Sequence, residues 1–189
     1  MKKTILFFTL ILASFYGFSQ NSVYGVRAGI NISDLDFEDQ YDNIPHTHRN
    51  GFMIGFFAEY KLSNLIDIAP EIQYSAEGSK EEDFMIPNSE DDTKYSLRTN
   101  FIQLPVLLKF NLSNNFALAV GPQVSLKAHK FEDLVNNITF SGVAGIDYML
   151  TDEFFLDFRY KYGLQNIFDD EVGFEAKGNT MQIGFGVKF

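Results

Sequence analysis

The final residues of the chain, 179–189, alternate strictly between apolar side chains and polar or small ones. The apolar parity carries Met181, Ile183, Phe185, Val187 and Phe189. The other parity carries Gln182, Gly184, Gly186 and Lys188. A repeat of two residues is the period of a β-strand, so this stretch predicts a strand with one apolar face. At the end of a soluble domain such a strand would leave an unpaired edge, whereas in a barrel it closes the sheet against the first strand.

Seven further segments show the same alternation, and they run over residues 23–32, 51–62, 66–76, 98–112, 116–128, 138–150 and 154–164. Tight turns at 63–65, 113–115 and 151–153 alternate with four longer connections. Transmembrane barrels combine short periplasmic turns with longer external loops, and their strands need about 10 residues to cross at a tilt of about 45°. The sequence therefore predicts an all-β fold, an eight-stranded antiparallel up-and-down transmembrane β-barrel.

Alternation alone does not tell which parity faces the lumen, since a soluble lipocalin-like barrel would turn its apolar face inward. The apolar parity is bulky on nearly every strand, and an eight-stranded barrel encloses little more than its own side chains. The opposite parity interleaves charged residues with glycines, at Gly25, Gly29, Gly55, Gly121, Gly145, Gly163, Gly184 and Gly186. We therefore expect the apolar parity to face lipid and a crowded polar lumen inside.

Aromatic residues fall near both ends of the predicted strands, as the interfacial girdles of a membrane barrel do. The periplasmic girdle would contain Tyr24, Tyr60, Phe110, Phe116, Tyr148, Phe154 and Phe189. The outer girdle would contain Phe52, Tyr74, Phe140, Tyr160 and Tyr162. Pro70, Pro105 and Pro122 lie inside strands, where proline cannot donate to the ladder. We expect a local bulge where Pro105 and Pro122 come almost opposite each other.

The amino-terminal residues have the organisation of a secretory signal. A basic start at Lys2 and Lys3 precedes an apolar run, and Gly17 and Ser19 occupy the −3 and −1 positions of a cleavage site. A buried amino-terminal helix is the alternative. We expect export to the outer membrane and divide the chain into a signal peptide, 1–19, and an outer-membrane β-barrel domain, 20–189.

Composition narrows the possible classes of protein. A mean hydropathy of −0.08 is too low for a bundle of transmembrane helices, each of which needs about 20 apolar residues. The chain has no Cys, which excludes disulfides, thiolate metal sites and Cys nucleophiles. A net charge of −10 argues against nucleic acid as a partner. We expect no cofactor and no metal.

Several short motifs resemble a known family. They are Tyr24-Gly-Val-Arg-Ala-Gly-Ile-Asn31, Phe101-Ile-Gln-Leu-Pro-Val-Leu-Leu-Lys-Phe110, Gly121-Pro-Gln123 and Val187-Lys-Phe189. Through them the whole mature chain resembles the small PorT-like outer-membrane β-barrel family of Bacteroidota-type bacteria. The resemblance implies an eight-stranded barrel. It does not imply a catalytic set, and the namesake's link to protein secretion does not extend to every relative.

The lumen parity gathers charged residues from the whole chain, namely Arg27, Glu59, Lys61, Asp67, Glu71, Lys109, Lys127, Asp147, Asp157, Arg159, Lys161 and Lys188. In the predicted registers Lys61 faces Asp67. Asp147 faces Asp157, with Arg159 diagonal to both. Adjacent carboxylates can act as general acid and base, but buried charges need partners, and Arg159 supplies one. We interpret the set as a structural network that also blocks diffusion through the bore.

Histidines and acidic residues collect in the predicted external loops. His46, His48 and His129 could serve a metal or a lipid-modifying hydrolase, but no third ligand stands at a clear spacing. The acidic residues are Asp34, Asp36, Glu38, Asp39, Glu81, Glu82, Asp83, Glu90, Asp91, Asp92, Asp169, Asp170 and Glu171. Near lipopolysaccharide, divalent cations bridge such groups.

These observations favour a non-enzymatic barrel whose external loops have an envelope-structural or surface-interaction role. The alternatives are an accessory of a secretion or uptake complex and a lipid-modifying enzyme. We expect outer-membrane lipids, lipopolysaccharide and the barrel-assembly machinery as partners, with another envelope protein as a further candidate, no nucleic acid, and a monomeric chain.

The terminal strand also predicts an assembly signal, carried by Phe185, Val187 and Phe189. Deletion of Phe189 should lower the yield of inserted protein without changing any activity of the inserted barrel. The inserted fraction can be measured by the heat-modifiable shift on a gel. Normal insertion of the shortened chain would contradict this assignment.

Overall fold

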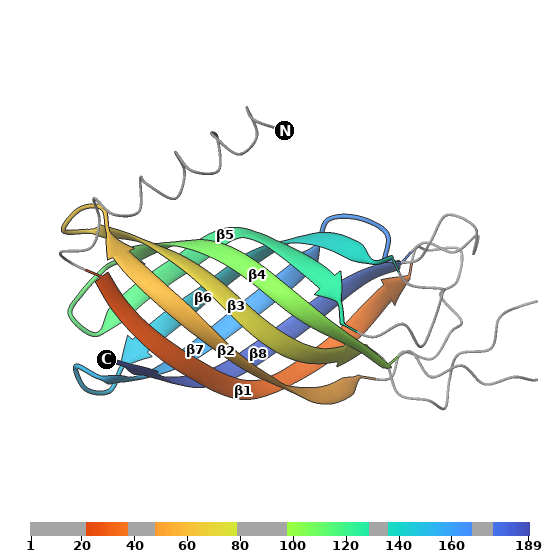
Figure 1. The fold of residues 1–189 in the computed structure, drawn as a ribbon, viewed down its shortest axis with the longest axis horizontal. Coiled ribbons are helices and arrows are strands. Elements are labelled where there is room, and N and C mark those ends of the chain that lie inside the picture. The colour runs from red at the N-terminus through yellow and green to blue at the C-terminus, as the bar shows by residue number, and fades with distance from the viewer. Residues whose placement is uncertain (1–21, 38–47, 79–97, 129–135, 168–175) are drawn as a thin grey trace, which may run out of the picture.

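The computed structural model describes residues 22–37, 48–78, 98–128, 136–167 and 176–189. Eight strands form one closed barrel in which each strand pairs antiparallel with its neighbours in sequence, and the last strand pairs with the first (Figure 1). The strands are β1 (Ser22–Phe37), β2 (Arg49–Lys61), β3 (Ile66–Gly78), β4 (Arg98–Asn111), β5 (Phe116–Lys127), β6 (Ile138–Met149), β7 (Phe154–Gly163) and β8 (Ala176–Lys188). The predicted fold class is confirmed.

The sequence predicts a signal peptide and argues against a bundle of transmembrane helices. The predicted signal peptide, 1–19, lies outside the described residues. Within the described part of the chain, no helix has both the length and the apolar character needed to cross a bilayer.

The seam between β1 and β8 closes the barrel, as the sequence predicts. Gly25 lies opposite Lys188, and Arg27 lies opposite Gly186. The terminal Phe189 is also part of the seam, since its N–H donates to the carbonyl of Tyr24 at 2.8 Å. The Tyr24 N–H in turn donates to the Phe189 carbonyl at 3.3 Å. The last strand is therefore paired to its end, while the role of its aromatic terminus in assembly stays a prediction.

The three tight turns share one local structure. In the first, the Ser63 hydroxyl oxygen accepts the backbone N–H groups of Leu65 and Ile66, at 3.2 and 3.1 Å. Ser113 and Thr151 do the same in the other two turns. A hydroxyl at this position satisfies donors that the hairpin itself leaves free, which keeps each connection short.

The barrel consequently has two unlike ends. The three turns and the carboxyl terminus lie at one end, here called the turn end, and the longer connections leave from the other, the loop end (Figure 1). The outward face between the ends is apolar. Along β7 and just beyond, outward residues from Phe154 to Leu164 are all exposed and hydrophobic or aromatic. At about 3.3 Å per residue and a tilt of about 40°, this stretch covers about 25 Å, the height of the apolar band of outer-membrane barrels.

Aromatic rings near the two ends of the barrel pack in cross-strand pairs. At the turn end, the rings of Phe116 and Tyr148 have centroids 4.8 Å apart. Nearer the loop end, Phe52 and Tyr74 have centroids 5.8 Å apart. Phe116 and Tyr148 are directly opposed on β5 and β6, whereas Tyr74 lies opposite Ile54, so Phe52 and Tyr74 contact each other diagonally.

The lumen is less polar than the sequence predicts. Buried apolar side chains on its inner face are Met53, Phe57, Phe101, Leu107 and Phe155. Glycines on the facing strands leave space for the rings, because a Cβ on Gly25 would lie 2.7 Å from Phe57 Cε1. A Cβ on Gly186 would likewise overlap the Phe155 ring. The inward glycines therefore act as sockets for large side chains from neighbouring strands.

Four strands extend further toward the loop end than the alternation predicts, and one of them is β2, which begins at Arg49 and not at residue 51. β1 continues to Phe37 and β8 begins at Ala176, because the two pair with each other beyond the start of β2 at Arg49. β3 continues to Gly78, so Glu77 belongs to a strand and not to the acidic loop. This end of β3 is a strand because it pairs with β4, although its composition is typical of a loop.

The bulge expected near Pro105 and Pro122 is wrong. Leu104 pairs with Val124, and Leu108 pairs with Val120, so four steps along β4 match four steps back along β5. A bulge would add a residue to one strand and shift this register. The pairing is only interrupted between these points, and Gly121 allows the β4 backbone to approach closely there.

The socket role of glycine can be tested by adding one methyl group. Gly186→Ala should lower the free energy of unfolding by about 1–3 kcal/mol, because the new methyl overlaps the Phe155 ring in a filled lumen. Gly142→Ala is the matched control, since no atom lies within 4 Å of its Cβ position. Urea titrations of both variants in lipid vesicles measure the difference. Equal free energies of unfolding for the two variants would show that the lumen side chains shift to make room for the extra methyl.

Candidate functional site

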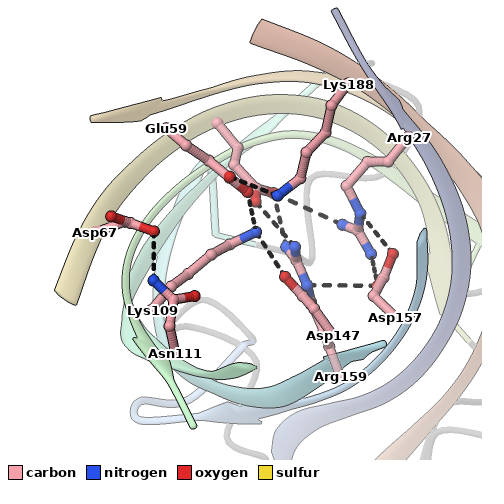
Figure 2. A network of polar contacts seen from close by, with 10 residues as sticks. Arg27, Glu59, Asp67, Lys109, Asn111, Asp147, Asp157, Arg159 and Lys188 are labelled. Carbon is pink, nitrogen blue, oxygen red and sulfur yellow. Dashed lines mark hydrogen bonds and ion pairs between the residues drawn. The ribbon is translucent and has the colours of Figure 1, made fainter. Parts of the chain in front are cut away.

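A network of buried charged side chains crosses the lumen (Figure 2). The cations are Arg27, Lys109, Arg159, Lys161 and Lys188. The anions are Glu59, Glu71, Glu77, Asp147 and Asp157. The two sets have five members each, so this network is neutral when every group is ionised. Neutrality matters because a charge without a partner in a region of low dielectric constant is costly.

The centre of the network consists of two arginine–carboxylate pairs. Arg159 holds Glu71 with two hydrogen bonds, from Nη1 to Oε2 at 2.7 Å and from Nη2 to Oε1 at 2.9 Å. Arg27 binds Asp157 through Nε, at 3.2 Å, and through Nη2. Its Nη1 donates to Gln73 Oε1 at 2.8 Å. Paired hydrogen bonds of this kind fix both the position and the orientation of the guanidinium.

Toward the turn end, lysines replace arginines. Lys109 Nζ lies 2.5 Å from Glu59 Oε1 and 2.6 Å from Asp147 Oδ2. Lys188 reaches the other oxygen of Glu59 at 2.7 Å and is the most exposed cation of the network, at 19% of its side chain. The Lys109 ammonium also lies over the rings of Phe57 and Phe155, at 5.4 and 5.5 Å from their centroids. Ion pairs and cation–π contacts therefore close this end together.

Toward the loop end, amides continue the network. Gln73 donates to Gln103 at 2.6 Å, and Gln103 donates to Glu77 at 2.8 Å. Glu77 forms an ion pair with Lys161 and accepts from Ser75 at 2.9 Å. Hydrogen bonds thus link the two arginine–carboxylate pairs to the Lys161–Glu77 pair at the loop end. The combined side chains form a plug across the bore.

The structure brings together most of the residues in the predicted lumen network. The members that it joins are Arg27, Glu59, Glu71, Lys109, Asp147, Asp157, Arg159, Lys161 and Lys188. Lys61 lies opposite Asp67 as predicted, but its side chain is exposed at the end of β2. Asp67 instead accepts a hydrogen bond from Asn111 Nδ2 at 2.8 Å (Figure 2). Lys61 reaches the solvent at the turn end, where no burial forces it into a pair.

The arrangement around Asp147 and Asp157 also differs from the expectation. The two residues lie opposite each other, yet Asp157 binds Arg27 and Asp147 binds Lys109. The two terminal nitrogens of Arg159 bind Glu71 across the lumen, and only its Nε lies near Asp157, at 3.4 Å. Contacts across the bore therefore decide which cation each carboxylate binds. The adjacency of two residues on neighbouring strands does not decide it.

Sequence reasoning missed three members of the network. Gln73 and Gln103 were overlooked because they are uncharged, and Glu77 because it begins an acidic run. A signal was present, since Glu77 continues the inward parity of Glu71, Gln73 and Ser75. Extending the alternation by one step would have found it.

The predicted histidine site is only partly described. His46 and His129 lie outside the described residues. His48 is exposed before β2, with Nδ1 3.4 Å from Asp34 Oδ2. Among described residues, no group of three His, Cys, Asp or Glu side chains is placed to hold a metal ion.

The family of the chain follows from its sequence. Residues 18–169 match the model of the outer membrane protein beta-barrel domain. The chain belongs to this family. It is located in the cell outer membrane, with the apolar outward face of the barrel in lipid and the charged plug in its lumen.

Solved structures share the fold at low sequence identity. Neisserial surface protein A is 15% identical, with 90% of this chain and 100% of that chain covered and a TM-score of 0.59. Ail, the attachment invasion locus protein of Yersinia pestis, is 16% identical over the same shares, with a TM-score of 0.51. Ail in complex with the heparin analogue sucrose octasulfate is 13% identical over the same shares, with a TM-score of 0.50. No curated protein matches the sequence significantly.

Removing one side of a plug pair should be far more damaging than removing an exposed charge. Arg159→Met should destabilise the barrel by about 3–5 kcal/mol, because Glu71 then loses both hydrogen bonds in a buried setting. Adding Glu71→Met should recover part of this loss. Lys61→Met is the control and should change the free energy of unfolding by less than about 0.5 kcal/mol.

Urea unfolding of these variants in vesicles shows how much of the loss in Arg159→Met comes from leaving Glu71 unpaired. If Arg159→Met and Lys61→Met were equally stable, the central pair would contribute nothing to the fold.

Proposed function

We propose that the protein is a non-enzymatic outer-membrane barrel that holds its acidic loops at the cell surface, in a surface-interaction or envelope-structural role. The observation that supports this proposal best is the neutral plug. Its charged groups are paired with one another, and its side chains occupy the bore. A barrel with this interior is suited to anchoring and presenting loops.

The plug argues against two other functions. A diffusion pore needs an open polar channel, which the wider barrels of porins provide. A general acid or base needs access to a substrate, whereas the lumen carboxylates are buried and used in ion pairs. The external loops remain as the part of the chain through which it would act.

Charge defines the class of partner that we propose for these loops. Their acidic runs, such as 81–83, 90–92 and 169–171, favour partners that bring cations. Lipopolysaccharide with bridging divalent cations has this character, and so does an envelope protein with a basic surface. Ail was solved with a polysulfated heparin analogue. A ligand of that charge would be repelled by the loops of this chain.

The wider assignments are also proposals. We place the chain in the PorT-like group of the family because of its Tyr24–Asn31 and Phe101–Phe110 motifs, and we expect a monomer inserted by the barrel-assembly machinery. An accessory role in a secretion or uptake complex is the second candidate, supported by the same group membership. A lipid-modifying role would have to use His48 and the histidines of the loops.

The test is capture of partners from native membranes in mild detergent with bound divalent cations preserved. A variant with Glu81→Gln, Glu82→Gln and Asp83→Asn should retain clearly less lipopolysaccharide or envelope protein than the natural chain. A control variant with Asp152→Asn and Glu153→Gln removes acidic groups at the turn end and should retain as much as the natural chain. Equal retention by all three proteins would contradict a role for loop charge.

A further inference from the structure

The outer part of the lumen contains buried polar atoms that no protein group satisfies. Asn31 Oδ1, Ser141 Oγ and Thr180 Oγ1 have no hydrogen-bond partner within the described structure. The three residues are 0%, 4% and 1% exposed. Leaving such an atom unpaired is costly, and in native proteins ordered water or a ligand supplies the missing bond.

The first of these atoms is linked to the ion pair near the loop end. Asn31 donates through Nδ2 to Ser75 Oγ at 2.7 Å, and Ser75 donates to Glu77 at 2.9 Å. Glu77 is paired with Lys161. The unsatisfied oxygen of Asn31 therefore belongs to an amide that already lies beside this pair and has no freedom to turn away.

Strand register places the other two atoms around the same lysine. Thr180 on β8 lies directly opposite Lys161 on β7. Ser141 on β6 lies opposite Gly163, the next inward residue of β7 after Lys161. Because inward side chains two residues apart are neighbours on a sheet face, both hydroxyls line the lumen beside Lys161.

The plug also contains two unpaired atoms, but their setting differs. Asp147 Oδ1 and Arg159 Nε belong to groups whose other atoms form ion pairs, and Arg159 Nε lies 3.4 Å from Asp157. At the loop end, Asn31, Ser141 and Thr180 are neutral side chains of the inward parity on β1, β6 and β8. This contrast points to a site there and not in the plug.

The required ligand follows from the donors and acceptors that must be satisfied. Asn31 Oδ1 needs a donor, while the two hydroxyls can each donate and accept. The neighbouring Glu77 and Lys161 already balance each other, so an added ion of either sign would face a like charge. A small neutral molecule with hydroxyl groups meets these conditions.

We propose that the outer polar cluster, defined as Asn31, Ser75, Glu77, Ser141, Lys161 and Thr180, binds a small neutral hydroxylated molecule, either water or a small polyol. The ligand enters from the loop end, because the arginine pairs and the ring-covered Lys109 close the lumen toward the turn end. The barrel then has a hydrated site at the loop end, next to the ion-paired plug. This inference is independent of what the loops bind.

The decisive experiment is magnetisation transfer from water to methyl groups, measured by NMR on the full refolded chain in lipid nanodiscs. The Thr180 methyl should receive magnetisation from water. The Ala119 methyl, buried on the inner face of β5 beside the plug, should receive much less. No transfer to Thr180, or equal transfer to both methyls, would overturn the proposal.

Substitutions give a second readout. Thr180→Val removes the hydroxyl at constant shape and should raise the unfolding equilibrium constant about fivefold, because the bond to the bound molecule is lost. Thr180→Ser is the matched control, because it keeps the hydroxyl and with it the bond to the bound molecule. A Thr180→Val chain as stable as the natural one, or more stable, would show that the hydroxyl has no ligand.

Titration with glycerol distinguishes a site for a polyol from a site for water alone. Saturable shifts at Thr180, with loss of the water signal, would identify a polyol site. A water signal that glycerol leaves unchanged would identify a site for water alone. Both outcomes support the proposal, whereas the absence of water signal and of saturable shifts would refute it.

Discussion

The structure depends on the narrow bore of an eight-stranded barrel. Such a bore is little wider than the side chains that fill it, so each inward group must have a partner or a socket. Arg159 and Glu71 meet across the lumen for this reason, and Gly186 gives its space to the ring of Phe155. The same constraint that stabilises the barrel also removes the channel that a wider barrel would enclose.

The filling of the bore changes along its axis. At the turn end, Lys109 combines ion pairs with two aromatic rings, which fill the closed side. At the loop end, amides and hydroxyls join the ring of Phe101 beside Lys161, and some of their atoms need partners that the protein does not supply. A plug below and a polar pocket above are therefore two consequences of one gradient in side-chain chemistry.

The wall of the barrel shows how backbone pairing tolerates local defects. The turns repeat one hydroxyl-capped structure, and the seam is bonded as far as Phe189. Pro105 and Pro122 interrupt one ladder without shifting its register. In a membrane every strand must remain paired with both neighbours, so a proline costs individual hydrogen bonds while the register persists.

Local alternation determined the fold, because a period of two residues fixes which side chains share a face and short turns fix which strands pair. It also determined the opposed pairs Asp147–Asp157 and Lys61–Asp67, since both follow from turn length alone. Which carboxylate binds which cation was decided only by the tertiary structure. The partners meet across the bore, at a distance and angle that depend on closure of the whole barrel.

The ends of the strands also show which features the sequence determined and which the tertiary structure decided. The sequence near Glu77 has the composition of a loop, and only pairing with β4 makes it a strand that turns its carboxylate inward. The sequence likewise assigns Lys61 to the inward parity, but its position at the end of β2 leaves it in solvent. Periodicity along one strand tells which way a side chain points. Only the assembled barrel decides whether it is buried there, because burial depends on all eight strands at once.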